Sequence, residues 1–589
     1  MDAANGMTVA PELLDALAER AKDTDLGALD ARLRAAGGCA RPILLKGKIE
    51  TCDGHGITRV WSTESEPDGV LRKACGNRRE AVCAPCAERY RQDAWHLIAA
   101  GLRGGKGVPD TIAQHPAVFV TLTAPSFGVV HARPSGPDGQ PRRCRPRRDD
   151  PICPHGRPLS CRAVHGEGDP RIGEPLCPEC FDYPAAVTWN NALGELWRYT
   201  TIYIPRTMAR LTGMTQVALK QEVRPAYVKV AEYQRRGLVH LHVLARLDRA
   251  MPDYRADELH PPAARFGVEL LERSIREAVA DVSAPVPAEL GTGRVRWGAQ
   301  LDVRQLRTGD ERGEIAGYLA KYATKSTEQA GGLLHRVERD QVEKVNVRAH
   351  VRGFMRSAFE LDALVAKARS QTRTLVGRPA PDVETDWNPA ALAIRLRRGM
   401  SKREALRVRR HDGQASTGRV ARLLDGQPER DGTTLAVELD TGGVVHLADV
   451  ASIGPPTRRA RARDRRDPRL GRCAHALGYR GHCLTKSRRY STTFKALREA
   501  REAFVHEQIL ARSTDATQRA IADATAEQRT AAFEWVATGH VTAIDAYLAD
   551  MSAAQARESR RAAREALAMA AIDQQTTTRE DRCRPTVPR

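Results

Sequence analysis

The feature that most restricts the fold is the segment Val228–Leu247, in which two runs of alternating apolar and polar residues flank Arg235-Arg236-Gly237. Such alternation is typical of strands, and glycine in third place suits a three-residue hairpin loop that ends in a left-handed residue. With that loop, Glu232 lies opposite His240. Because side chains two residues apart share one face of a strand, His242 lies on the face of His240. The segment predicts an antiparallel hairpin that gathers one carboxylate and two imidazoles.

These three side chains are candidate metal ligands. Two imidazoles and a carboxylate, with coordination positions left open, suit a catalytic divalent ion such as Mg²⁺ or Mn²⁺. The alternative is a pair of histidines that only form hydrogen bonds on a sheet surface. The glutamate opposite His240 argues for the metal site, and the set is therefore Glu232, His240 and His242.

A second candidate site is GEIAGYLAKYATKSTE (Gly313–Glu328), which is predicted to be a helix. Tyr318 and Tyr322 are four residues apart and share one helical face, and Lys321 and Lys325 each follow a tyrosine by three residues. A free tyrosine titrates near about pH 10 and is a poor nucleophile at neutral pH. A nearby ammonium favours the phenolate, and a metal ion on a phosphate makes phosphorus more electrophilic. The alternative is a tyrosine stripe that faces the core beside exposed lysines.

Cysteines at zinc-knuckle spacing occur twice. Cys83-Ala-Pro-Cys86 has Cys75 eight residues upstream, and Cys39 or Cys52 could supply a fourth ligand. The second cluster lies in a loop-rich stretch rich in Pro, Arg, Cys and His, and it is predicted to form one closed zinc site from Cys153, Cys161, Cys177 and Cys180, with His155 or His165 as substitutes. Closed four-ligand sites are structural. The alternative is a set of reduced, buried thiols, and no role is assigned to Cys144, Cys473, Cys483 or Cys583.

The charge balance points to a polyanionic partner. The chain has 93 Lys and Arg against 73 Asp and Glu, which gives a formal net charge of +20. Such an excess attracts phosphates without regard to sequence. No apolar stretch approaches the roughly 18 residues of a membrane-spanning helix, and the N-terminus has no secretory pattern. We therefore expect a cytoplasmic protein that makes no membrane contact and whose thiols are reduced.

A chain of 589 residues exceeds what one hydrophobic core usually serves, so two or three domains are expected. Patterning predicts, in order, an N-terminal helical segment (1–36), a cysteine-rich zinc-binding region (37–110), an α+β core (111–330) with a zinc-binding insertion at about 140–183, a helical region (331–407), a small β insertion (408–456), a basic segment (457–510) and a helical C-terminal tail (511–589).

The ordered set of TLT (Thr121–Thr123), HLH (His240–His242) and YLAKYATK (Tyr318–Lys325) resembles the three motifs of the HUH endonuclease superfamily. The doubled tyrosine is similar to that of the gene A initiators of isometric single-stranded DNA phages. The flanks CGNRREAVCAPCAERYRQD, CPHGRPLSCRAVH, PLCPECFDY and GHCLTKSRRYSTTF resemble replication initiators of actinobacterial plasmids and integrative elements. This resemblance covers most of residues 39–510, within which about 410–470 looks like an addition.

The resemblance implies an α+β fold with an antiparallel-sheet HUH core, in which the histidines bind the divalent ion. It implies a rolling-circle initiator that nicks origin DNA, forms a 5′-phosphotyrosyl bond and leaves a 3′-OH primer for a polymerase. Single-tyrosine relatives keep their tyrosine at the position of Tyr322, and some have Glu at the position of Tyr318, so this chain is expected to use a two-tyrosine exchange. The resemblance also favours Cys39 over Cys52 as the fourth ligand of the first zinc site, beside Cys75, Cys83 and Cys86. No Walker-type phosphate loop occurs, so a host helicase is expected to unwind the DNA.

Basic side chains suggest where DNA binds. GHCLTKSRRYSTTF (Gly481–Phe494) places a candidate phosphate-contact patch at Lys486, Arg488, Arg489 and Tyr490, although charge clusters are often only solvated faces. Arg78 and Arg79 beside the first knuckle are weaker candidates.

Three other functions compete with the initiator. A conjugative relaxase usually has its nucleophile ahead of the histidine motif, whereas Tyr318 and Tyr322 follow it here. A tyrosine recombinase usually carries His-x-x-Arg, a spacing that this sequence lacks. A zinc-dependent DNA-binding regulator would place the same histidines and tyrosines in its core.

Overall fold

The computed structural model describes residues 11–52, 58–250, 258–290, 293–307, 311–325, 330–375, 405–410, 415–425, 435–439, 444–446, 450–454, 469–512, 514, 517, 519, 524 and 529–582. The chain divides into two compact units. The first comprises Met1–Ala284, Val295–Phe354 and His475–Arg589, and the second comprises Pro285–Arg294 and Met355–Ala474.

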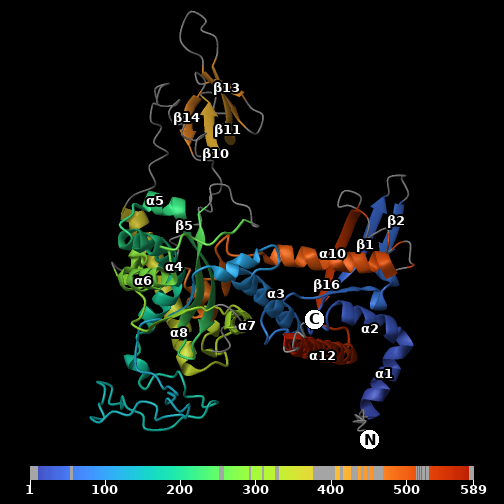
Figure 1. Cartoon of the computed structure of the whole chain (residues 1–589), viewed down its shortest axis with the longest axis horizontal. Coiled ribbons are helices and arrows are strands. Elements are labelled where there is room, and N and C mark those ends of the chain that lie inside the picture. Colours follow the sequence, from blue (N-terminus) through green and yellow to red (C-terminus); the bar gives the residue numbers. More distant parts are fainter. Residues whose placement is uncertain are drawn as a thin grey trace, which may run out of the picture. The chain divides into compact units, whose positions relative to one another are not determined.

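The first unit is built around a five-stranded sheet (Figure 1), in the order β15-β5-β6-β4-β9 with every neighbouring pair antiparallel. The strands are β4 (Ala117–Leu122), β5 (Val223–Tyr233), β6 (Val239–Arg249), β9 (Leu301–Gln305) and β15 (Leu484–Lys486). The apolar, β-branched run at Ala117 is confirmed as a strand, and it pairs with β6 in the interior of the sheet. Mixed helices and antiparallel strands agree with the predicted α+β class.

The β5–β6 hairpin has the register that the sequence predicts. Glu232 pairs with His240, and the backbone N–H of Gln234 donates to the carbonyl of Leu238 at 2.9 Å. Gly237 closes the loop with φ of 81°, a left-handed conformation that L side chains rarely adopt. A Cβ there would also lie 2.5 Å from the Phe354 ring. The glycine is therefore needed for both the turn and the packing against it.

Polar contacts fix the hairpin loop. The Asn190 side chain donates to the carbonyl of Gly237 at 2.9 Å and accepts from the N–H of Val239 at 3.1 Å. His350 Nε2 donates to the carbonyl of Arg236 at 3.0 Å. Asn190 is fully buried and His350 nearly so, and each thus satisfies backbone groups that water cannot reach. The strand ends that carry Glu232 and His240 are held rigidly as a result.

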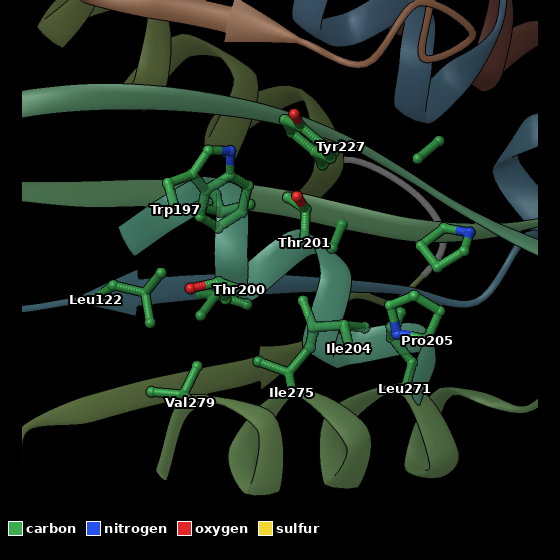
Figure 2. A pocket seen from close by; sticks show the side chains of 15 residues that line it. Leu122, Trp197, Thr200, Thr201, Ile204, Pro205, Tyr227, Leu271, Ile275 and Val279 are labelled. Carbon is green, nitrogen blue, oxygen red and sulfur yellow. The ribbon is translucent and has the colours of Figure 1, made fainter. Parts of the chain in front are cut away.

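Helices cover both faces of the sheet. On one face lie α3 (Ala84–Arg103), α7 (Glu311–Ala323) and α10 (Phe494–Arg512), whose apolar side chains form one core with β5 and β6. On the other face lie α4 (Tyr183–Leu211) and α6 (Val268–Asp281). Between these two helices and the sheet is an apolar cavity of about 90 Å³, lined by side chains that include Trp197, Ile204 and Tyr227 (Figure 2).

The chain ends meet in a second sheet of the same unit. Its order is β16-β1-β2, with β3 also paired to β1, and the strands are β1 (Ile43–Cys52), β2 (Thr58–Ser62), β3 (Leu71–Lys73) and β16 (Arg529–Thr538). The predicted all-helical C-terminal tail is therefore wrong at β16, which pairs antiparallel with β1 along its length. The alternation in Arg529–Thr538 is weak because most of its side chains are exposed.

Helices α1 (Pro11–Asp23), α2 (Leu26–Ala35) and α12 (Ala543–Arg582) complete this part of the unit. Arg20 on α1 forms ion pairs with Asp545 of α12 at 2.9 Å and with Asp68 at 2.7 Å. Asp545 is fully buried, so its charge depends on this partner. Helices α1 and α12 are thereby joined by a buried charge network.

The second unit contains a small five-stranded antiparallel sheet in the order β13-β12-β11-β10-β14. It is formed by β10 (Ala405–Arg410), β11 (Ala415–Asp425), β12 (Leu435–Leu439), β13 (Val444–His446) and β14 (Val450–Gly454), where the sequence predicted a β insertion at 408–456. Of the basic segment predicted at 457–510, residues 457–468 lie outside the described residues. Helix α5 (Gln216–Glu222) belongs to the first unit, whereas β7 (Ala284–Pro285), β8 (Arg294–Val295) and α8 (Ala349–Leu375) each contain residues of both units. In the described parts, we find no helix that combines the length and apolarity needed to span a bilayer.

Candidate active site

A carboxylate and two imidazoles meet on the α7 side of the hairpin. Both histidines donate Nε2–H to the same Glu232 oxygen, His240 at 2.7 Å and His242 at 2.8 Å. The side chains are only 14% (His240), 4% (His242) and 16% (Glu232) exposed. Burial raises the pKa of Glu232, but the two imidazole hydrogen bonds outweigh burial and lower it to about 2. The carboxylate is ionised at neutral pH, as a metal ligand must be.

The three ligand atoms lie within 4.8 Å of one another and form a group that could hold a metal ion. Burial lowers the pKa of His242, although Glu232 opposes this, so burial favours the neutral imidazole. Thr121 on β4 places Oγ1 3.2 Å from His242 Nδ1, and Phe119 stacks on the imidazole at 5.7 Å. A metal-bound histidine commonly donates its second nitrogen to a neighbouring oxygen. Thr121 and Phe119 therefore orient His242 so that Nε2 faces Glu232.

The two tyrosines project from α7 toward the same histidine. Leu319 and Ala320 of α7 are buried in the core, which leaves the tyrosine face of the helix directed at the hairpin. The Tyr318 and Tyr322 rings lie 5.5 Å and 5.7 Å from the His242 ring, and 4.8 Å from each other. Tyr318 is 42% exposed, and Tyr322 is partly buried. The packing of α7 on the sheet therefore brings the two tyrosines next to His242, which lies about 80 residues earlier in the sequence.

The lysines of the tandem motif differ in position. Lys325 Nζ lies 5.4 Å from the centre of the Tyr322 ring, whereas Lys321 is exposed on α7. Burial raises the pKa of Tyr318, and the Tyr322 hydroxyl raises it further. Neither effect favours the Tyr318 phenolate. A nucleophilic Tyr318 would therefore depend on positive charge beside Glu232, such as that of a bound divalent ion.

The first cysteine group brings together the four predicted residues. The Sγ atoms of Cys39 and Cys83 are 3.7 Å apart, those of Cys75 and Cys86 3.7 Å, and those of Cys39 and Cys86 3.6 Å. A tetrahedral zinc ion with Zn–S bonds of about 2.3 Å separates its sulfurs by roughly 3.7 Å. Cys52 is exposed and lies outside this group. The residues therefore fit a structural metal such as zinc, with Cys39 as the fourth member.

The second cluster is not the single four-cysteine site that the sequence predicted. Cys153, Cys177 and Cys180 group with His155, whereas Cys161 belongs to another group, formed by His131, Cys144, Cys161 and His165. The reason is a backbone bridge in which Arg145 and Cys161 exchange hydrogen bonds at 2.7 and 2.9 Å, which holds Cys161 beside Cys144. The structure thus adds two residues to the candidate ligands, His131, which the sequence did not single out, and Cys144, to which no role was assigned. The only sequence signal for either was membership of the same Cys- and His-rich stretch.

The predicted DNA-contact patch is partly structural. Tyr490 is fully buried, and its hydroxyl donates to the carbonyl of Ile98 at 3.2 Å, so it is not available to DNA. Lys486 Nζ donates to backbone carbonyls of its own loop, including that of Ser491 at 2.9 Å. Arg489 is partly buried and Arg488 is exposed. The loop adds strand β15 to the sheet, and of the four residues Arg488 remains the most accessible.

Arg78 and Arg79 also serve the structure. Arg78 Nη1 donates to the carbonyls of Ala323 and Lys325, at 3.2 and 3.3 Å, and so caps the C-terminal end of α7. Arg79 Nη1 donates to the carbonyl of Leu334 at 2.7 Å. Both arginines lie in the loop between Cys75 and Cys83. The first cysteine group thus supports the helix that carries the tyrosines.

Comparison with known proteins assigns a family. The sequence model described as "RepSA: Replication initiator protein, pSAM2" matches residues 25–382 and 411–554. A replication initiator protein of Streptomyces ambofaciens is 36% identical over 373 residues, which cover 61% of this chain and 76% of that protein. No solved structure matches. Because the second matched range includes 411–470, our expectation that this stretch is an addition to the family is not supported. The chain belongs to the RepSA family of replication initiator proteins.

Proposed function

We propose that this replication initiator is an HUH endonuclease that starts rolling-circle replication by nicking one strand of origin DNA through a tyrosine. The observation that supports this most is the position of both Tyr318 and Tyr322 rings within 6 Å of His242, whose Nε2 shares a Glu232 oxygen with His240. A core role for these groups, as in a DNA-binding regulator, gives no reason for a partly exposed phenol beside an ionised carboxylate.

The chemistry follows from the residues that are brought together. Glu232, His240 and His242 would hold a divalent ion that draws charge from the scissile phosphate. The tyrosine Oη attacks phosphorus and loses its proton, the P–O3′ bond breaks, and the 3′ oxygen leaves as a hydroxyl. A P–Oη bond now holds the 5′ end, so the energy of the phosphodiester is kept for rejoining. The second tyrosine can attack the regenerated origin while the first still carries the original end.

The function is tested by incubating the purified chain with single-stranded origin DNA and Mn²⁺. We expect a covalent protein–DNA adduct and a free 3′-OH, with the attached peptide containing Tyr318 or Tyr322. Binding without any adduct would support a non-enzymatic regulator instead. Adduct formation at a tyrosine outside α7 would require a different active site. The 3′-OH would prime a host polymerase, and a host helicase would open the duplex in the cytoplasm.

A basic groove offers a path for the DNA strand. It has a volume of about 520 Å³ and lies at the end of the sheet where β4 finishes and the β5–β6 hairpin turns. Arg133, Arg145 and Arg235 line it and are exposed. Gln234 also lines it and lies two residues from Glu232 on β5, so the groove begins near the metal ligands. Arginines along such a groove attract a phosphate backbone without selecting sequence.

Replacing Arg133, Arg145 and Arg235 by alanine together is expected to weaken single-stranded DNA binding at least about tenfold in low salt. Loss of three phosphate contacts should also reduce the slope of log affinity against log salt by about 2. Titration of a fluorescent oligonucleotide at several salt concentrations measures both quantities. The control is a triple alanine variant of Arg198, Arg210 and Arg273, which are exposed on α4 and α6, on the face of the sheet opposite α7. It removes the same charge and should change binding little. Equal losses in the two variants would argue against the groove.

A further inference from the structure

The segment between β4 and α4 lacks the usual means of holding a fold. Residues 128–182, all described, contain isolated β-bridges and one short 3₁₀ turn, Pro178–Cys180, but no α-helix or named strand. Two large apolar side chains in its middle point outward, Ile152 at 70% and Val164 at 54% exposed, whereas the buried ones, Val130 and Phe181, lie near its two ends. A segment of this size without an apolar core usually depends on metals or disulfides. Its cysteines are all free.

Two Cys/His groups of four occupy the segment, and their ligands interleave along the chain. One group takes the pair His131 and Cys144 and the later pair Cys161 and His165. The other group takes the pair Cys153 and His155, which lies between these two, and the last pair, Cys177 and Cys180. Each group therefore closes a loop of chain that contains a pair from the other group. Neither group can be completed by one continuous stretch.

The separations within the groups suit tetrahedral metal sites. In the first group, Cys161 Sγ lies 3.6 Å from His165 Nε2, and Cys144 Sγ lies 3.8 Å from His131 Nδ1. In the second group, Cys177 Sγ lies 3.7 Å from His155 Nδ1. A tetrahedral zinc ion, with bonds of about 2.3 Å to sulfur and 2.0–2.1 Å to nitrogen, separates such atoms by roughly 3.6 Å. The observed separations therefore match the edges of a coordination tetrahedron.

The first group also has an orienting carboxylate. His165 is fully buried, and its Nδ1 donates to Asp169 at 2.7 Å, which leaves Nε2 directed at Cys161. A carboxylate on the far nitrogen is the usual support for a zinc-bound histidine. The carbonyl of Asp169 in turn accepts from Arg235 of the β5–β6 loop at 3.4 Å. The group is thus linked through one residue to the hairpin that carries Glu232 and His240.

From this interleaving we propose that residues 128–182 form a cross-braced module with two structural zinc ions, one bound by Cys₂His₂ and one by Cys₃His ligands. Each ion fixes the chain path that the other requires, so the ions bind together and are lost together. With the Cys39 group, the full chain binds three zinc ions. The inference does not depend on the nicking chemistry, because metal content is measured without DNA.

Zinc content of the purified full-length chain tests the proposal. We expect about three zinc ions per chain, and an X-ray absorption average of about three sulfurs and one nitrogen per zinc. This readout needs no variant and so cannot be confused by misfolding. Two ions with four sulfurs each would overturn the proposal and favour a single four-cysteine site in the segment.

Variants then test the cross-brace. Cys144→Ser and Cys177→Ser each remove a ligand of a different group, and each should lower the content by about two ions, with no further loss in the double variant. Cys83→Ser, in the group near the N-terminus, should remove only one ion, and the exposed Cys52→Ser none. Loss of one ion by each single variant and of two by the double would mean independent sites and would overturn the interlock.

Discussion

Replacing Tyr318 and Tyr322 together by phenylalanine is expected to abolish the covalent adduct with origin DNA and to lower strand cleavage at least about a thousandfold. Phenylalanine keeps the ring contacts with His242 and removes only the two hydroxyls, so the fold should be retained. Among the described residues, the tyrosine rings that contact His242 are those of Tyr318 and Tyr322. Gel detection of the adduct, and single-turnover cleavage of labelled single-stranded DNA, measure the effect.

The single variants separate the roles of the two hydroxyls. Tyr322→Phe is expected to lose initial cleavage or strand transfer, because Tyr322 is the tyrosine of the tandem motif that has its lysine close by, with Lys325 Nζ 5.4 Å from the ring. Tyr203→Phe, which removes a hydroxyl from α4 on the opposite face of the sheet, serves as the matched control and should cleave normally. Unchanged joining by the double variant would remove tyrosine catalysis from the proposed function altogether.

Removal of a metal ligand is the second large effect that we expect. His242→Ala should lower the cleavage rate by about two orders of magnitude, which corresponds to roughly 3 kcal/mol of transition-state stabilisation. The ligand set would fall to Glu232 and His240, so the response to added Mn²⁺ should weaken at the same time. Single-turnover cleavage across a Mn²⁺ titration separates the two effects. His482→Ala, at an exposed histidine, is the control.

A positioning role for Thr121 gives a graded comparison. Thr121→Val keeps the shape of the side chain but removes the oxygen 3.2 Å from His242 Nδ1. We expect metal affinity to fall about tenfold, with cleavage recovered at saturating Mn²⁺. In His242→Ala, saturating Mn²⁺ should not restore the rate. If His242→Ala cleaves like the unaltered chain at every Mn²⁺ concentration, the histidine is not a ligand of a catalytic ion.

The hairpin could be predicted because the residues that determine its register are close together in the sequence. The Arg235–Gly237 loop fixes the register, and the register alone places Glu232 opposite His240. The common face of Tyr318 and Tyr322 follows equally from a spacing of four residues on a helix. That α7 lies against the hairpin could not be derived from spacing, since it depends on the packing of Leu319 and Ala320 into the core beside α3 and β5.

The prediction of a single four-cysteine zinc site failed because the grouping of its residues is not determined locally. In residues 128–182 the chain path is irregular, so separation along the sequence does not measure separation in space. The bridge between Arg145 and Cys161 decides which group Cys161 joins, and such a bridge leaves no periodic pattern. The prediction of Tyr490 as a DNA contact failed for a similar reason. A tyrosine among basic residues is typical of a DNA contact, but here Gly101 of α3 leaves room for the ring to be buried, and the sequence does not show that contact. Strand β16 was missed because its partner, β1, lies almost 500 residues earlier.

Both phenols sit within one turn of a single helix, and that helix is clamped at its end by Arg78. Four residues of helix advance by about 6 Å, so the backbone positions of the two tyrosines keep a fixed spacing on α7. In the proposed reaction, the second phenol therefore already lies beside the metal ligands while the first holds the original 5′ end. The second cut of a replication cycle would then need no rearrangement of the fold.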